Sequence, residues 1–132
     1  MQRLRVDRLS GATRRVEVDG RAVVAPCHVA TSPLSRAVGL LGTAHLGPGE
    51  GLWLEPCASV HTAFLRVPIG CVFVDAHGVV LRVADPLPRW RVAGARGARA
   101  VVEAPAGTFA GVRPGDVVTT TPWTAGDPAA EG

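Results

Sequence analysis

The N-terminal part of the chain shows an alternation of apolar and polar residues that is typical of β-strands. Residues 3–9 and 13–18 both alternate in this way, and residues 10–12 separate them. Because side chains of a strand point alternately to its two faces, this pattern predicts a β-hairpin. The second strand ends at an Asp-Gly pair at 19–20, a strong turn signal, and residues 21–30 then resume an extended pattern.

A different pattern follows at Ser32 and predicts one helix. Ser32 suits the N-cap position and Pro33 the first helical position, and the segment LSRAVGLLG continues to Gly42. The helix is short, and Gly39 inside it lowers its intrinsic stability.

The rest of the chain predicts further strands separated by turns. Residues 52–54 open one strand, and a Cys-Ser-His-Thr segment that includes Val60 and Phe64 also favours extended structure between two prolines. A long Arg- and Pro-containing connection is expected at 84–98, and a Gly-Asp turn at 115–116. The remaining predicted strands are 71–75 and 79–83, which form a hairpin around 76–78, and then 98–104 and 117–121.

Composition supports a single β-rich domain. The chain has 132 residues, of which 47% are hydrophobic and 19% charged, a globular balance that is long enough for one core. Sixteen glycines and eleven prolines divide it into short segments, which favours strands and turns over a helical bundle. We expect residues 1–124 to form this domain and residues 125–132, which are small and polar, to be a disordered tail.

The net charge of +3 comes from arginine alone. Acidic residues dilute the N-terminal arginines, so these are interpreted as a solvated strand face, whereas the second group has only Asp85 nearby and is the better candidate for an anion-binding edge. No aromatic stacking pattern accompanies either group, so we expect no specific nucleic-acid binding. The two groups are Arg3, Arg5, Arg8, Arg14, Arg15 and Arg21, and then Arg82, Arg89, Arg91, Arg96 and Arg99.

Cysteine content and hydropathy indicate a cytoplasmic protein. The three cysteines, Cys27, Cys57 and Cys71, form no CxxC motif, and three free thiols suit a reducing compartment. The first ten residues carry charges where a signal peptide needs an apolar run. No segment approaches the roughly 20 apolar residues that span a bilayer, so no membrane association is expected.

The richest cluster of reactive side chains is EPCASVHTAF at 55–64. Cys57 and His61 could act as nucleophile and base, but four positions along a strand separate them by about 13 Å at 3.3 Å per residue. Alternation instead places Cys57, Ser59 and His61 in a row on one face. Three alternatives stay open: a catalytic Cys57, a thiol packed in the core, and a binding site.

A metal site would need three or four converging ligands. Cys27 and His28 are adjacent and point to opposite faces of a strand, and His77 lies in a turn. We therefore expect no metal and no other cofactor.

Several segments together resemble a known family. These are SPLSRAVGLLG, then PCASVHTAFLRVPIGCVFVDAHGVVLRV, LPRWR and AVVEAPAGTFAGVRPGDVV, which span about residues 27–121. Their order is similar to that of domain of unknown function family 192, in particular to its branch with a Pro-Cys-x-Ser-x-His-Thr motif. The resemblance implies a mostly β, β-rich α+β domain: a compact, barrel-like mixed sheet with one or two short helices. It implies no reaction.

Two positions depart from the family pattern. Gly70 stands where members usually have an aspartate, and Leu65 stands where they usually have a methionine before the arginine. The missing acid removes a natural partner for His61 or Arg66.

We therefore expect a binding function. The hypothesis is that the domain binds an anionic small molecule or a protein segment at a rim, because an arginine pair beside a histidine suits a carboxylate or phosphate group. The alternatives are an enzyme that uses Cys57 as nucleophile and an accessory interaction module without a pocket. Ligand identity and oligomeric state stay open. The expected binding residues are Cys57, Ser59, His61, Thr62, Arg66 and Arg91.

Overall fold

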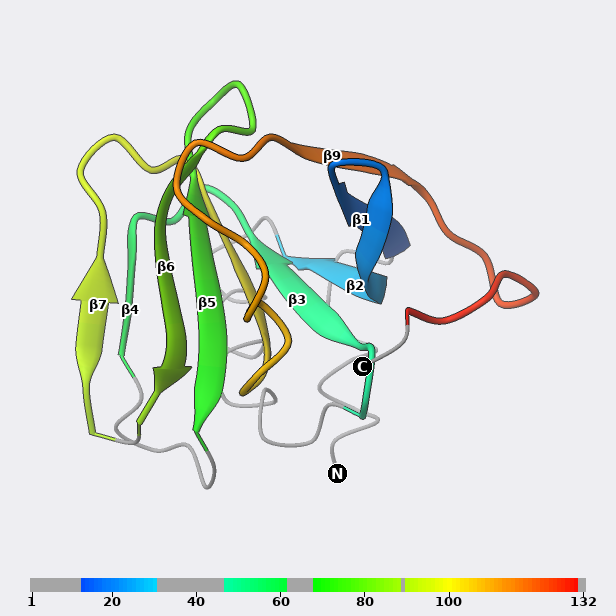
Figure 1. Ribbon diagram of the computed structural model, residues 1–132, viewed down its shortest axis with the longest axis horizontal. Coiled ribbons are helices and arrows are strands. Elements are labelled where there is room, and N and C mark those ends of the chain that lie inside the picture. The colour runs from blue at the N-terminus through cyan, green and yellow to red at the C-terminus, as the bar shows by residue number, and fades with distance from the viewer. Residues whose placement is uncertain (1–12, 31–46, 62–67, 89, 131–132) are drawn as a thin grey trace.

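The computed structural model describes residues 13–30, 47–61, 68–88 and 90–130. Within these ranges the chain forms nine β-strands and no helix (Figure 1). The strands are β1 (Thr13–Val18), β2 (Arg21–Ala30), β3 (Gly51–Leu54), β4 (Ser59–His61), β5 (Ile69–Val74), β6 (Val80–Leu87), β7 (Val92–Gly94), β8 (Ala100–Pro105) and β9 (Val118–Pro122).

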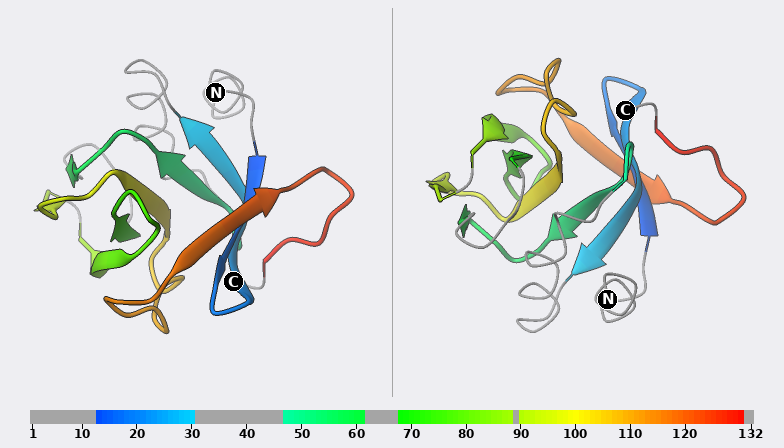
Figure 2. Two further views of the ribbon diagram at one scale, coloured as in Figure 1. Left: turned by 90° about the horizontal axis from the view of Figure 1, so that it is seen from above. Right: turned by 90° about the horizontal axis from the view of Figure 1, so that it is seen from below.

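Seven strands form one mixed sheet in the order β6-β5-β8-β3-β2-β1-β9, and β4 and β7 form a separate two-stranded ribbon. Only β2 and β3 are parallel among the described pairs. The sheet curls strongly (Figure 2). Its two edge strands meet at one corner, where Val79 bridges Val117 and Val118 donates its N–H to the carbonyl of Gly78 over 2.8 Å. The result is a curled half-barrel.

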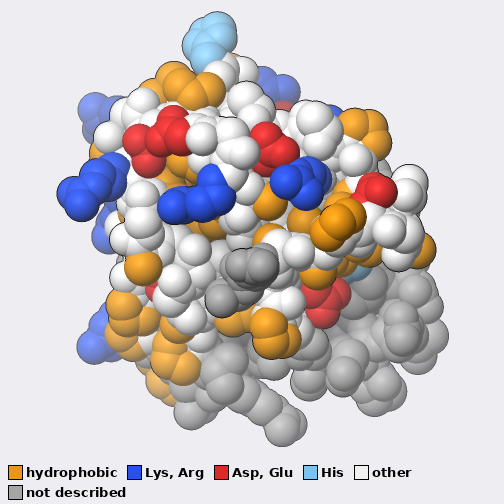
Figure 3. Space-filling model, turned by 45° about the vertical axis from the view of Figure 1, so that its right-hand side comes forward, with side chains coloured by type: hydrophobic (Ala, Val, Ile, Leu, Met, Phe, Trp, Pro, Cys, Tyr) orange, Lys and Arg blue, Asp and Glu red, His pale blue; other side chains and the backbone are white. Residues whose placement is uncertain are grey.

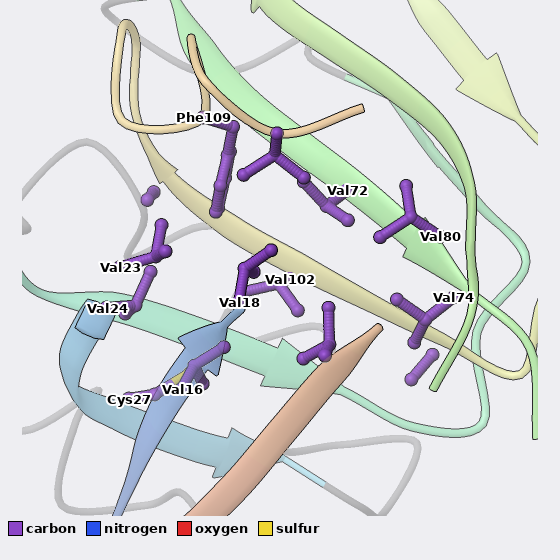
Figure 4. Close-up of a cluster of buried hydrophobic side chains, with 14 residues drawn as sticks. Val16, Val18, Val23, Val24, Cys27, Val72, Val74, Val80, Val102 and Phe109 are labelled. Atoms are coloured by element: carbon purple, nitrogen blue, oxygen red, sulfur yellow. The ribbon is translucent and has the colours of Figure 1, made fainter. Parts of the chain in front are cut away.

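The central strands β5 and β8 are buried on both faces, which explains their nearly continuous apolar sequences. One face contributes to a core inside the curl. There Val16 of β1, Val72 of β5 and Phe109 of the loop after β8 converge (Figure 4). The other face contributes to a second core around Phe73, Val101 and Leu54.

The β4–β7 ribbon covers the second core. Val60 of β4 and Ala93 of β7 are directly paired and are both buried in this core. Burial of the paired side chains fixes which face of the ribbon lies against the sheet.

The hydrophobic pattern predicts most strands within the described ranges. The strands expected at 13–18, 21–30, 71–75, 79–83 and 117–121 are confirmed, with bounds that differ by a few residues. The turn at 19–20 is also confirmed, since Asp19 and Gly20 have φ values of 52° and 77°, the conformation in which an Asp-Gly hairpin turn is favoured. The connection expected at 84–98 is partly wrong, because it contains the end of β6 and all of β7.

Three further predictions concern the N-terminal strand, the helix and the C-terminal tail. The strand at 3–9 and the helix at 33–42 lie outside the described residues. Within the described part, β1 pairs on its two edges with β2 and β9. Residues 125–130, assigned above to a disordered tail, make defined contacts: Trp123 donates its indole N–H to Pro128, and Ala130 donates its backbone N–H to Ala25.

Candidate functional site

The β4–β7 ribbon carries the sequence-predicted site, and several contacts hold it in place. Arg82 of β6 donates a side-chain N–H to the carbonyl of Gly94 over 2.9 Å. Beyond the strand ends, Ala95 donates its N–H to the carbonyl of Ala58, and Cys57 donates its N–H to Arg99 at the start of β8. The ribbon is therefore fixed to the sheet at the end where Ser59 pairs with Gly94, and one of its faces is buried.

The outer surface near β7 exposes large apolar side chains. Trp90 is 61% exposed and Val92 is 76% exposed, and they flank the exposed Arg91. Trp90 also has a φ of 62°, a left-handed conformation that costs a non-glycine residue roughly 1–2 kcal/mol. Its exposure makes Trp90 a candidate contact residue. Exposed aromatic and arginine side chains are the types enriched at interaction hot spots.

Strand pairing places the backbone of His61 next to β7. His61 of β4 pairs with Val92 of β7, so the backbone at position 61 lies beside the segment that carries Arg91. Residues 61 and 91 are thirty positions apart in sequence, and only the ribbon makes them neighbours. Thr62 and Arg66 lie outside the described residues.

Cys57 and Ser59 occupy different environments. Cys57 precedes β4 and is half-buried, packed against the second core, whereas Ser59 is exposed and pairs with Gly94. The thiol of Cys57 donates to the carbonyl of Ser59 over 3.2 Å, which uses its proton. The described contacts of Cys57 thus anchor the start of the ribbon.

The other two thiols are buried in the cores. Burial raises the pKa of Cys27 and of Cys71 well above their usual range, and the nearby carboxyl groups of Glu103 and Asp85 raise that of Cys71 further. Both thiols are therefore protonated at physiological pH.

Glu103 is a buried acid that the sequence analysis did not single out. It is completely buried in β8, directly opposite Cys71 of β5 and Leu52 of β3. The only signal in the sequence is its place as a single carboxylate inside the apolar segment AVVEA.

The space beside Gly70 is occupied by the carboxylate of Asp85. A Cβ atom at Gly70 would lie 2.7 Å from the carboxyl carbon of Asp85, which comes from the neighbouring strand β6. Asp85 accepts hydrogen bonds from the backbone N–H groups of Gly107 and Phe109, both over 2.7 Å. The carboxylate therefore fixes the loop after β8.

Other polar residues have structural roles. Asp116 accepts a hydrogen bond from the backbone N–H of Arg113, which confirms its interpretation as a turn residue. His28 is half-buried beside Glu50 at 3.3 Å, while Cys27 is buried in the core, so the two side chains point to opposite faces as expected. Within the described ranges, no group of three or more His, Cys, Asp or Glu side chains is placed to hold a metal ion.

On the face shown in Figure 3, arginine side chains lie next to acidic ones in the upper part. On that face the positive charge is therefore offset locally. The part of the chain that the structure describes contains no helix long and apolar enough to cross a membrane.

Comparison with known proteins finds a family model and solved structures that are similar to this chain. The model of the DUF192 family, described as "Uncharacterized ACR", matches residues 14–120. A crystal structure of a protein of unknown function from Novosphingobium aromaticivorans DSM 12444 is 26% identical, with a TM-score of 0.70, and the match covers 85% of this chain and 89% of that one. None of the curated proteins matches.

A second crystal structure supports the fold alone. It is that of a putative transcription regulator from Sinorhizobium meliloti 1021, 20% identical with a TM-score of 0.68, and the match covers 83% of this chain and 94% of that one.

Proposed function

Because this chain belongs to the DUF192 family, which is uncharacterised, we propose a function from its own surface: it is a binding domain that takes an acidic segment of a partner protein at the β4–β7 ribbon. The proposal rests on the three consecutive exposed residues Trp90, Arg91 and Val92 at the start of β7, where Val92 pairs with position 61 of β4. In this proposal His61 and Arg91 contact the anionic group, with Ser59, Thr62 and Arg66 along the same rim and Cys57 at its base.

The exposed apolar side chains favour a protein segment over a free small anion. A small anion would need only the cations, whereas Trp90 and Val92 offer apolar area that water covers in the free protein. Trp90 is also held in a left-handed conformation without the compensation of deep burial. Such local strain tends to occur at functional positions. The proposal places the domain in the cytoplasm, where its three thiols stay reduced.

The proposal is tested by selecting binders from a random peptide library displayed on phage, with the folded protein as bait. We expect enrichment of Asp- and Glu-containing peptides. Trp90→Ala should weaken a selected peptide by about 30-fold, the effect of losing a hot-spot residue of about 2 kcal/mol. Arg91→Gln should weaken it several-fold, since an exposed ion pair contributes at most about 1 kcal/mol.

Arg96→Gln is the matched control, because Arg96 is an exposed arginine in the turn that follows β7. It should leave peptide affinity unchanged. Enrichment of peptides without acidic residues, or equal affinity for the wild-type protein and Trp90→Ala, would remove the proposal.

Trp90→Gly separates binding from folding. Glycine adopts a positive φ without steric cost, so this variant should unfold at a midpoint no lower than that of the wild type while losing the peptide. A large loss of stability would show instead that Trp90 is a packing residue. Thermal unfolding followed by circular dichroism gives the midpoint.

A further inference from the structure

A second candidate site lies inside the curl, and its lining residues differ from those proposed for the β4–β7 ribbon. Two adjoining hollows of about 240 and 210 Å³ share Trp53, Glu55 and Thr120 in their walls. Arg14 and Val29 complete the first hollow, and Arg99 and the turn at 75–78 complete the second. Together they approach the size of ordinary small-molecule sites, roughly 300–1,000 Å³.

The first hollow lies next to the core inside the curl, but side chains do not fill it. Arg14 lies two residues before Val16, Thr120 two residues after Val118, and Val29 two residues after Cys27. Side chains two positions apart on a strand share a face, so each of these extends a row that begins in the core. The next layer outward is thus an arginine, a threonine, a valine and the half-buried Trp53, arranged around an open space.

Arg14 is held in place by uncharged partners. Its Nη2 atom donates to the carbonyl of Thr120 over 3.3 Å and to the hydroxyl of Thr120 over 3.0 Å. No carboxylate lies within ion-pair distance of Arg14 in the described part of the chain. A guanidinium has five N–H donors in a planar fork, so Nε and Nη1 remain for a ligand.

The two acidic groups in the walls of the hollows already have hydrogen-bond or ion-pair partners. Glu55 accepts the indole N–H of Trp53 over 2.8 Å and lies 3.4 Å from Arg99. Asp75 accepts the backbone N–H groups of His77 and Val79 over 2.8 and 3.0 Å. Of the two arginines in these walls, Arg99 is paired with Glu55, whereas Arg14 has no carboxylate partner among the described residues.

We propose that this hollow binds a small aromatic carboxylate, with its ring along Trp53 and Val29 and its carboxylate on Arg14. The apolar walls suit a ring, and a half-buried guanidinium with a free edge suits a planar two-oxygen anion. This site is independent of the peptide-binding ribbon, so either can fail without the other.

The wild-type protein alone tests the proposal. Benzoate and 2-naphthoate, each beside its neutral carboxamide, are titrated against ¹⁵N-labelled protein, and the indole N–H of Trp53 and the amide of Thr120 are followed by NMR. We expect each carboxylate to bind at least tenfold more tightly than its amide, and 2-naphthoate to bind more tightly than inorganic phosphate. Equal affinities of carboxylate and amide, or tighter binding of phosphate, would overturn the proposal.

Neighbouring arginines on β1 supply a matched pair of variants. Arg14→Gln should weaken 2-naphthoate at least tenfold, whereas Arg15→Gln should not, since Arg15 is paired with Glu17 over 2.6 Å and points to the other face. The NMR spectrum of each variant reports whether it is folded. Binding unaffected by Arg14→Gln, or shifts confined to the indole signals of Trp90 and Trp123, would also overturn the proposal.

Discussion

Asp85 limits which residue can stand at position 70. Its carboxylate, held by two backbone N–H groups, occupies the space that a side chain at position 70 would enter. A side chain at position 70 would therefore force this carboxylate to move. The sequence comparison could detect the missing acid, but not the carboxylate beside it, because residues 70 and 85 become neighbours only through the pairing of β5 with β6.

A double-mutant cycle measures this relationship. Gly70→Ala should lower the free energy of unfolding by about 2 kcal/mol or more, because its Cβ displaces a charged hydrogen-bond acceptor. In an Asp85→Ala background the same substitution should cost less than about 0.5 kcal/mol, since nothing remains to be displaced. Urea unfolding of the four proteins gives both values. Equal costs in the two backgrounds would show that the two positions are not coupled.

The three cysteines should differ in reactivity with the same reagent. Burial raises the pKa of Cys27 and Cys71, so the reactive thiolate stays scarce for both between pH 7 and 9. We expect iodoacetamide to modify Cys57 first in the folded protein, and the other two only after unfolding, as read by peptide mass spectrometry.

The rate at Cys57 decides between two of the hypotheses raised by the sequence. Its thiol proton is engaged with the carbonyl of Ser59, so we expect labelling at pH 7 to be slower than that of glutathione. Labelling much faster than glutathione would contradict this description and support a nucleophilic role.

At the scale of elements, the sequence predicts a strand more readily where its apolar segment is long. β5 and β8 are six-residue, mostly apolar segments, and both are predicted by the sequence. β7 has three residues, of which the first is exposed, and it lies among arginines and prolines. It forms because Ala93 pairs with Val60 over the second core, a contact that no local pattern reveals.

The two faces of the structure should respond differently to truncation. Phe73 of β5 is completely buried, and Phe73→Ala should lower the free energy of unfolding by about 3–5 kcal/mol. Val92 is 76% exposed on β7, and Val92→Ala should change it by less than about 0.5 kcal/mol. Chemical denaturation measures both. A large loss on truncating Val92 would mean that the ribbon contributes its outer face to folding.

For the whole molecule, the sequence predicted a β-rich domain, and the family resemblance implied its barrel-like sheet. The corner that closes the curl depends on Val79 and Val117, which are close only after seven strands are in order. The hollow beside Trp53 likewise draws single residues from four strands. Neither could be predicted from segments read one at a time.

The central claim is that the exposed ribbon at β4 and β7 binds an acidic protein segment. The most direct measurement is an NMR titration of ¹⁵N-labelled protein with an acidic peptide selected from the library. We expect the largest amide shifts on residues 59–61 and 90–94, and no shift of the Trp53 indole signal. Shifts centred on other surfaces, or no saturable shift at the ribbon, would contradict it.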